Sequence, residues 1–401
     1  MDNHVNDDED DKLVADEQVL VNEEEKSEDV AHELTKNISA RAEKSRTFPF
    51  WRLPALTRSR VTKFMKPLDI ILLTMTSTPF KRFMKSYKLS GMDLLFLLRN
   101  VLTKSRFVLH TDDNNFGISL RFPNSPSLKF VFPKQWKTFG EWKNVNGEPM
   151  QIEKWTENAV IFGGDLDYPQ KFKFMEQLAK HLVDIIHVDK HLLSASENKN
   201  FNLFDCFIWN FVPKFHQIHL GDLRFSYHVT PEQLRFLLNV VNCDHMLLNL
   251  SVEENVVEGL QLKSKSLEVS RFGDWLTMEY IIESECEEIS GQIEKVQPAE
   301  TVKLVKEWRA GEKLTNIKML DLHLSANQSL ALKIIDKFNG VKKLTETEKQ
   351  ILENGEMKGK FPSGEVRKIR RATDGKIAVL SVNRDLVKMK VLENGGVLKD
   401  F

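Results

Sequence analysis

The sequence predicts a mixed chain of the α+β or α/β class, in which short N-terminal helices precede a body of strands and helices and a C-terminal hairpin. This class is predicted from the spacing of apolar residues, which changes along the chain. Apolar residues recur at helical spacing from about residue 48 to 100, and they alternate with polar residues from about 104 to 155. From about 157 to 325 the two periods take turns, as in a sheet that is backed by helices.

Residues 1–45 form an acidic leader. They contain 15 acidic and 5 basic residues, a net charge of −10, whereas the whole chain of 401 residues carries −1. The remainder of the chain therefore carries +9. A segment with so little apolar surface is predicted to be disordered. Two interpretations stay open: a solubilising tail, or an acidic arm that folds back on the basic body.

Composition also bears on the compartment. The acidic start lacks the basic and apolar pattern of a signal peptide, and no run approaches the ~18 apolar residues of a membrane span. Cys206, Cys243 and Cys286 stand far apart with no CxxC pair. We therefore expect free, buried thiols in a reducing compartment, and a cytoplasmic or nuclear location or both.

Residues 46–92 are predicted to form a small bundle of short helices. Val61 and Phe64 have helical spacing, Pro67 opens a helix that runs to Thr76, and a further helix lies behind Pro79. Residues 93–156 follow as a linking helix, from about Met92 to Leu102, and a set of short antiparallel strands. The strands are indicated by alternating apolar residues over 107–109, 116–122 and 128–132.

Residues 157–325 are predicted to alternate strands with helices. Strands are expected at 159–162, 216–220, 246–250, 267–269 and 319–324, and helices at 172–186, 231–241, 274–283 and 298–308. Units of this kind favour a parallel sheet, curved like an irregular leucine-rich-repeat array, although no clean LxxLxLxxN consensus is present. Residues 326–401 form a C-terminal segment, in which Asp374-Gly375 is predicted to turn a hairpin between 366–371 and 377–382.

No group of residues predicts an active site, and we expect no catalytic residue, no metal and no cofactor. His187 and His191 have the spacing of one helix face, but a zinc site needs a third ligand, so surface or capping histidines are favoured. His216 and His219 lie in a predicted strand and point to opposite faces. Cys206 stands among aromatic residues, where burial makes a thiol inert. The chain is therefore predicted not to be an enzyme.

The basic run Arg367–Arg371 allows two interpretations. It matches the composition of a nuclear signal or a nucleic-acid patch. Residues 367, 369 and 371 share one face of a predicted strand, however, and a solvated strand edge is the favoured interpretation.

Three segments resemble a known family when they are taken in order. The first contains Phe48–Pro54, Val61 and Phe64, Pro67-Leu68-Asp69 with an aliphatic run, and Thr76-Ser77 before Phe80. The second is Thr301–Leu324, with Trp308 and Gly311, and the third is Ile369–Ala378 with Asp374-Gly375. Together they resemble the nematode F-box proteins with a type-2 F-box-associated domain, over most of residues 48–390. Phe80 and Thr76 depart from the tryptophan and valine usual in the F-box.

The resemblance implies a partner. An F-box binds the Skp-type adaptor of an SCF-type cullin–RING ubiquitin ligase, and the domain behind it binds a target protein. The adaptor-binding residues implied here are Leu53, Pro54, Val61, Phe64, Pro67 and Ile71. A helical pair of this size cannot bury its own apolar side chains, so a partner or the following domain must cover them. The alternative for each residue is a place in the internal core.

A second function stays open beside this one. The +9 charge of the body and Arg367–Arg371 would suit a non-catalytic nuclear or nucleic-acid-associated scaffold. Binding to nucleic acid falls steeply with salt, whereas an apolar adaptor contact does not. Salt dependence therefore separates the two functions.

Overall fold

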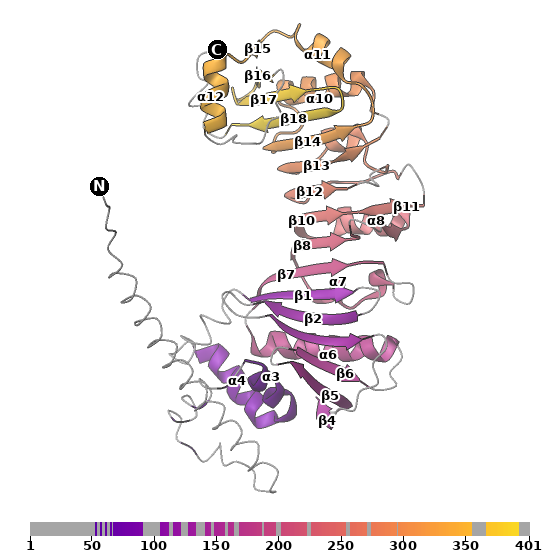
Figure 1. Cartoon of the computed structure of the whole chain (residues 1–401), viewed down its shortest axis with the longest axis vertical. Helices are drawn as coiled ribbons and strands as arrows, with labels where there is room; N and C mark the ends of the chain where they lie inside the picture. Colours follow the sequence, from indigo (N-terminus) through magenta and orange to yellow (C-terminus); the bar gives the residue numbers. More distant parts are fainter. Residues whose placement is uncertain are drawn as a thin grey trace, which may run out of the picture.

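One mixed sheet of sixteen strands forms the frame of the described part of the chain, and its strands are stacked like the rungs of a ladder (Figure 1). The computed structural model describes residues 53, 57, 61, 65, 67–90, 105–111, 115–121, 127–133, 141–145, 148–156, 159–163, 168–186, 188–197, 202–222, 226–253, 257–270, 274–294, 296–354 and 366–392. The acidic leader and the predicted linking helix 92–102 lie outside these residues. The strand order is β15-β16-β17-β18-β14-β13-β12-β10-β8-β7-β1-β2-β3-β6-β5-β4. Nine α-helices accompany the sheet in the described residues, so the predicted mixed class is confirmed.

Two short helices precede the sheet, as predicted. α3 (Pro67–Thr76) begins at its proline, where a missing N–H costs nothing, and α4 (Thr78–Ser90) follows after one residue. Both pack on α6 (Tyr168–Ile185) and its surroundings, since α4 contacts α6 and α3 contacts β4. The Thr74 hydroxyl donates to the Ile71 carbonyl at 2.6 Å and accepts from Nε2 of buried His181 at 2.9 Å.

One end of the ladder is mostly antiparallel. Its strands are β1 (Ser105–Thr111), β2 (Asn115–Arg121), β3 (Leu128–Pro133), β4 (Glu141–Val145), β5 (Glu148–Thr156) and β6 (Ala159–Gly163). The predicted antiparallel meander of β1, β2 and β3 is confirmed, with Leu109, Ile118 and Phe130 paired across the three strands and fully buried. β6 pairs parallel to β3 and antiparallel to β5.

Six parallel strands form the middle of the ladder, which confirms the predicted parallel sheet. They are β7 (Val188–Ala195), β8 (Phe215–Leu220), β10 (Cys243–Leu248), β12 (Ser266–Val269), β13 (Glu288–Ile293) and β14 (Met319–Leu324). One buried residue from each strand lines up across the sheet and on into β18, in what we call the aliphatic row. Its members are Leu193, Ile218, Met246, Leu267, Ile289, Leu320 and Met389.

Short helices and a small separate sheet connect these strands. They are η2 (Leu203–Asp205), α7 (Ile208–Phe211), β9 (Tyr227–Val229), α8 (Pro231–Arg235), the π-helix η3 (Phe236–Val240), β11 (Leu250–Val252), α9 (Met278–Ile282) and α10 (Pro298–Ala310). Thr230 caps α8 as predicted, in a reciprocal capping box with Gln233. The helix predicted from Asp274 is wrong at its start, because Thr277 caps α9 and the chain before it is not helical.

The other end of the ladder is antiparallel. β18 (Leu386–Val391) pairs with β14, and β17 (Ile377–Val382), β16 (Val366–Arg370) and β15 (Val341–Lys343) follow outward. α11 (Ser329–Ile335) and α12 (Glu346–Asn354) lie at this end (Figure 1). The predicted hairpin is confirmed, but its turn is longer than two residues: the Arg371 N–H donates to the Lys376 carbonyl at 2.8 Å and encloses four residues.

The predicted solvated edge at Arg367–Arg371 is wrong. β16 lies between β15 and β17, and Arg367, Lys368 and Arg371 are buried, at 1%, 5% and 3% exposure. Each is paired: Arg367 with both oxygens of Asp336 at 2.6 and 3.0 Å, Lys368 with Glu348 at 2.6 Å, and Arg371 with Asp374 at 2.6 and 2.9 Å. A buried cation is tolerated because a carboxylate is hydrogen-bonded directly to it.

Candidate interaction surface

A repeated burial pattern shapes the middle of the ladder. It occurs in five segments, at residues 215–220, 243–248, 264–269, 286–291 and 317–322. The first and fourth residues of each segment are buried, and the sixth is buried in all but one, where half-buried Gly291 stands. Residues three apart in a regular strand point to opposite faces, so the backbone at the start of each segment departs from a straight strand. The second, third and fifth residues therefore face away from the core.

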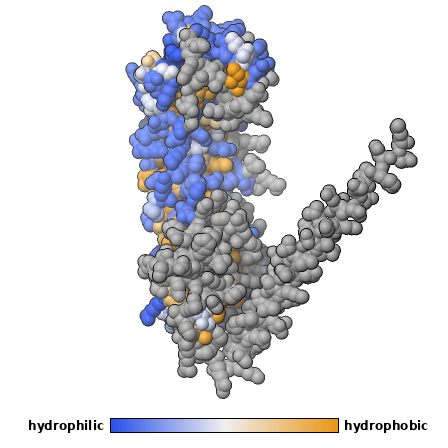
Figure 2. Space-filling model, turned by 90° about the vertical axis from the view of Figure 1, so that its left-hand side faces the viewer, coloured by the Kyte–Doolittle hydropathy of each residue, from blue (hydrophilic) through white to orange (hydrophobic). Residues whose placement is uncertain are grey.

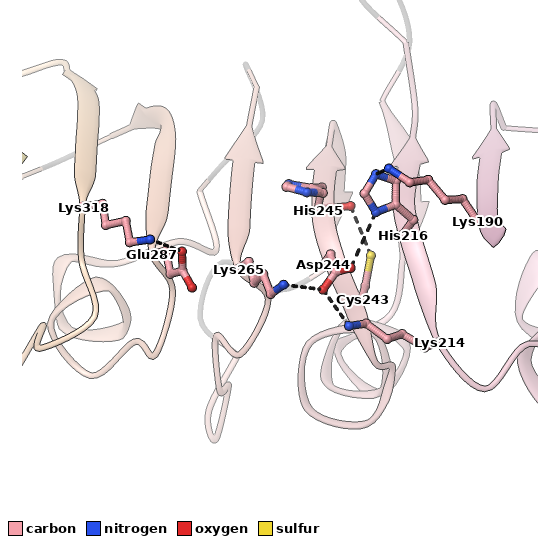
Figure 3. A network of polar contacts seen from close by, with 9 residues as sticks. All are labelled: Lys190, Lys214, His216, Cys243, Asp244, His245, Lys265, Glu287 and Lys318. Carbon is pink, nitrogen blue, oxygen red and sulfur yellow. Dashed lines mark hydrogen bonds and ion pairs between the residues drawn. The ribbon is translucent and has the colours of Figure 1, made fainter. Parts of the chain in front are cut away.

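The second residues of the five segments form a line of charges, the charged row: His216, Asp244, Lys265, Glu287 and Lys318. Asp244 is its centre (Figure 3). Its carboxylate lies 2.8 Å from Lys214 Nζ, 3.4 Å from Lys265 Nζ and 3.5 Å from His216 Nδ1. Farther along, Lys318 Nζ lies 3.0 Å from Glu287 Oε2. Charges of opposite sign thus alternate across neighbouring strands, an arrangement that stabilises their pairing modestly.

The charged row sets the ionisation of its members. Partial burial raises the pKa of Asp244, but its hydrogen bonds and charge interactions with Lys214 and Lys265 outweigh that effect and lower the pKa to about 2. Burial and then the charge of Lys190 lower the pKa of His216. Lys190 Nζ lies 3.0 Å from His216 Nε2 and has only protons to offer, so neutral His216 carries its proton on Nδ1, toward Asp244.

The fifth residues form a second line in register across the sheet: His219, Leu247, Glu268, Ser290 and Asp321. We call it the polar row, since four of its five members are polar. It continues on β18 with Lys388, whose Nζ lies 2.6 Å from Asp321 Oδ2. Beside this row an open hollow of about 560 Å³ lies over β12, β13 and β14. Its ionisable lining residues are Glu268, Asp321, His323 and Asp385. The face opposite the core is therefore polar and hollowed.

Seen from the left-hand side of Figure 1, the described surface is mostly hydrophilic, and hydrophobic residues reach it only in small separate areas (Figure 2). A partner that binds such a surface has to be held by hydrogen bonds and charges more than by apolar contact. The described residues contain no group of three or more His, Cys, Asp or Glu residues placed to hold a metal.

The three cysteines are free and buried, as predicted. Burial raises the pKa of the Cys206 thiol to about 12, that of Cys243 to about 12 and that of Cys286 to about 11. Thiols with such values are weak nucleophiles at neutral pH, because the thiolate is the reactive form.

The two histidine pairs are placed differently from each other. His191 lies half-buried in strand β7 after α6 has ended, so its helical spacing from His187, which is outside the described residues, has no structural meaning. His216 and His219 lie in β8 as predicted. His216 contacts a histidine of the neighbouring strand instead, with its ring centroid 5.1 Å from that of His245.

The residues expected to bind an adaptor lie at the start of the described chain. Leu53 and Val61 are half-buried and pack against the large core, and Pro67 is the first residue of α3. Ile71 is 2% exposed and therefore has little surface left for a partner in this structure. Pro54 and Phe64 lie outside the described residues. On the same helix Leu73 is 39% exposed, an apolar side chain that the sequence did not single out.

Comparisons with known proteins identify no relative of this chain. No model of a known protein family matches the chain, and searches of curated proteins and of solved structures also find no match. Within the described residues, every helix is too short or too polar to cross a membrane.

The charged row and the repeat behind it were missed by sequence reasoning. The signal was a buried residue three positions before the buried apolar residue of each strand that belongs to the aliphatic row. In the five segments that place is taken by Phe215, Cys243, Ser264, Cys286 and Ile317. A search for leucine there could not find the pattern, whereas a search for any small or apolar residue would have.

Proposed function

We propose that this chain is the substrate-recognition subunit of an SCF-type cullin–RING ubiquitin ligase. In this proposal residues 46–92 are an F-box that binds the Skp-type adaptor, and the strand ladder is an F-box-associated domain with leucine-rich-repeat-like units. The observation that carries it is the order of the motifs: Leu53-Pro54, then a helix opened by Pro67, a break at Ser77, and a second helix before a large strand-based body.

The adaptor-binding surface is formed by residues that precede and flank α3. Leu53 and Val61 are half-buried, so part of each side chain remains available to a partner. Leu73 adds an exposed apolar side chain on α3. Ile71 is buried in the core, and Thr74 of the same helix is hydrogen-bonded to His181 of α6, so α3 is held against the body. An amphipathic helical surface of this kind fits a hydrophobic groove in a partner.

The target is bound by the polar face of the ladder, where the charged row and the hollow lie. The protein itself performs no covalent chemistry in this proposal. It raises the local concentration of the target beside the ubiquitin-charged enzyme, and such proximity alone accelerates a bimolecular step by orders of magnitude. The same polar face would serve the alternative scaffold, but burial of Arg367, Lys368 and Arg371 in ion pairs leaves net charge as the main support for nucleic acid.

Replacing Leu53 and Pro54 together by alanine tests the adaptor contact. Each truncated anchor at an interface hot spot typically costs about 2 kcal/mol, a factor of ~30 in affinity, so we expect capture of purified adaptor and cullin to be lost. The measurement is a pull-down with full-length chain. A matched control is Thr78→Ala with Arg82→Ala, two exposed positions on the neighbouring helix, which should retain capture.

Thermal melting separates the possible results. If the double variant melts early, Leu53 and Pro54 belong to the core, and the adaptor interpretation of these residues is wrong. If it melts normally and still captures the adaptor, the F-box proposal fails at these residues. If the wild-type chain captures no adaptor, the proposed function as a whole is withdrawn.

A further inference from the structure

A cationic surface lies on α10 and α11, at the far end of the ladder from the proposed F-box (Figure 1). Lys303, Lys306 and Arg309 follow one another along α10, and Lys333 and Lys337 lie on or directly after α11. Four are exposed and Arg309 is half-buried. We call these five residues, with the apolar side chains described next, the cationic patch.

Two exposed aliphatic residues stand within the cationic patch. Leu330 is 58% exposed and Ile334 is 36% exposed, and both lie on α11 at a spacing of four, on the same side as Lys333 and Lys337. Phe338 lies between the two helices, with Lys306 Nζ 5.6 Å and Arg309 Cζ 5.9 Å from its ring centroid. The surface is therefore cationic at its rim and apolar at its centre.

The carboxylates of these helices do not neutralise the patch. Glu300 accepts from the Gln297 N–H at 2.7 Å and caps α10, and both oxygens of Asp336 receive hydrogen bonds from Arg367. Half-buried Glu307 is the remaining acidic residue of α10 and α11. The five cations therefore leave a clear positive excess, which suits an anionic ligand.

Buried hydrogen bonds beneath the cationic patch hold α10 and α11 in a fixed arrangement. Buried Gln328 accepts from the Thr301 hydroxyl of α10 at 2.9 Å and donates to the carbonyls of Val296 and Ala326 at 3.2 and 3.0 Å. Because Gln328 directly precedes α11, these bonds fix the two helices against each other. A preformed surface loses little conformational freedom when it binds.

One segment of the chain has matching chemistry. Residues 7–25 read DDEDDKLVADEQVLVNEEE and contain ten acidic residues and one basic residue. Between the acidic runs stand the aliphatic residues Leu13, Val14, Val19, Leu20 and Val21. These alternating acidic and aliphatic runs match the cationic and aliphatic side chains of the cationic patch. Nucleic acid would match the charges but would leave Leu330 and Ile334 without an apolar partner.

The chain is long enough for this contact within one molecule. Twenty-eight residue steps lead from Glu25 to Leu53, which packs against the core near the start of the described chain. Fully extended, they span about 95 Å. Eleven strand spacings of about 4.8 Å separate β4 from β14, which gives roughly 53 Å. The linker can therefore reach the far end of the ladder without being taut.

We propose that the acidic leader binds the cationic patch of its own chain, with residues 7–25 lying across α10 and α11. This contact does not depend on the proposed ligase function. It extends the interpretation of the leader as an arm that folds back, and it gives the arm a defined docking surface. Because its charges are exposed, salt weakens it strongly.

Zero-length carbodiimide cross-linking of the full-length chain tests the proposal. A mixture of ¹⁴N- and ¹⁵N-labelled chains is cross-linked, and mass spectrometry identifies the joined peptides. We expect carboxylates of residues 7–25 to join Lys303, Lys306, Lys333 or Lys337 within one chain. At about 0.5 M salt the screening length falls to a few ångströms, and the yield should drop about tenfold.

Three variants sharpen the experiment. Lys306→Glu with Arg309→Glu should lower the yield at Lys303, Lys333 and Lys337 about tenfold. Replacing the five acidic residues 7–11 by their amides should lower it about fivefold, and this change leaves the sequence of the folded body intact. Lys129→Glu with Lys173→Glu, exposed positions at the other end of the ladder, is the matched control and should change nothing.

The results of this experiment distinguish which ligand binds the cationic patch: the leader of the same chain, the leader of a second copy, or nucleic acid. Cross-links confined to mixed-isotope pairs would mean that the leader reaches a second copy, and would overturn the intramolecular contact. Cross-links that ignore both salt and charge reversal, or that fall elsewhere on the body, would overturn the patch as the docking surface. Nucleic acid copurifying on these lysines in place of the leader would overturn the proposal as well.

Discussion

The parallel middle of the ladder and its C-terminal end bury different kinds of side chain. Across the middle, the aliphatic row places one apolar residue of each strand against the next. At the C-terminal end, β16 and the residue after it bury three cations, Arg367, Lys368 and Arg371, each paired with a carboxylate of that end. The first arrangement can be extended by any strand of similar pattern, whereas the second accepts only a particular partner.

This difference suits the two positions in the ladder. A stack of repeated units exposes an apolar end and needs a distinct closing element. Arg367 ties β16 to Asp336 at the end of α11, and Lys368 ties it to Glu348 on α12. The buried ion pairs therefore attach the closing helices at defined places. Burial alone would attach them less specifically, because apolar contact has no direction.

Leu320→Ala is expected to have the largest effect on stability. Leu320 is fully buried between Ile289 and Met389, so the change removes apolar contacts and leaves a cavity. Comparable substitutions cost about 3 kcal/mol. Urea unfolding measures this loss, and amide hydrogen exchange should show faster opening in both β13 and β18. Exchange that rises on only one side of Leu320 would contradict a continuous core across the two regions.

Arg367→Met should cost less, about 2 kcal/mol. Methionine fills much of the volume, but the Asp336 carboxylate loses two charge-assisted hydrogen bonds. Because Asp336 is about one-third exposed, water replaces part of this loss. Hydrogen exchange should rise in β15, β16 and α11 and stay unchanged in β8 and β10.

The control for this prediction is Arg370→Ala, an exposed position on the same strand, which should change stability by less than about 0.5 kcal/mol. If Arg367→Met opened the parallel middle as readily as the end, the two regions would be one cooperative unit, and the comparison drawn above would fail.

The contrast also explains which parts of the structure could be predicted from the sequence. Strand positions such as Ile118–Leu120 or Met319–Leu324 follow from local alternation, and the cap at Thr230 follows from neighbouring residues. The burial of Arg367 and Lys368 could not be foreseen, because their partners lie 31 and 20 residues away in sequence. From sequence alone, a run of basic residues is predicted to be solvent-exposed. Only the fold shows that carboxylates distant in sequence lie beside it and allow it to be buried.

The candidate interaction surface also has features that could be predicted from the sequence and features that could not. That His216 and His219 lie in one strand was predictable, since only a strand pattern is needed. That His216, Asp244 and Lys265 stand side by side was not, because the spacing between the repeated segments varies and their first buried residue is not leucine. Because the repeated segments are unevenly spaced, the register between neighbouring strands cannot be derived from the sequence. That register determines which charged side chains of neighbouring strands lie side by side.

Asp244→Asn is expected to have the smallest effect, and its pH dependence distinguishes it from Leu320→Ala. The substitution removes the negative centre of the charged row and leaves Lys214 and Lys265 close to each other. For exposed or half-exposed pairs such losses amount to about 0.5 kcal/mol. Leu320→Ala removes no charge interaction, so its effect should not shrink in this acid range. The effect of Arg367→Met should shrink in acid through a different carboxylate, Asp336, whose pKa is lowered by its hydrogen bonds with Arg367.

The sign follows from the folded-state pKa of Asp244. That pKa is about 2, below the ordinary value of 3.8, so the folded protein holds the charged form more tightly than the unfolded chain does. The stabilisation is complete above about pH 4 and disappears as the pH falls toward 2. The difference in unfolding free energy between wild type and Asp244→Asn should therefore be constant from pH 5 to 7 and shrink below pH 4. Urea titrations of both proteins at each pH measure it. A difference that grows on acidification would show that the charged row does not stabilise the ladder, and its charges would then be explained by binding alone.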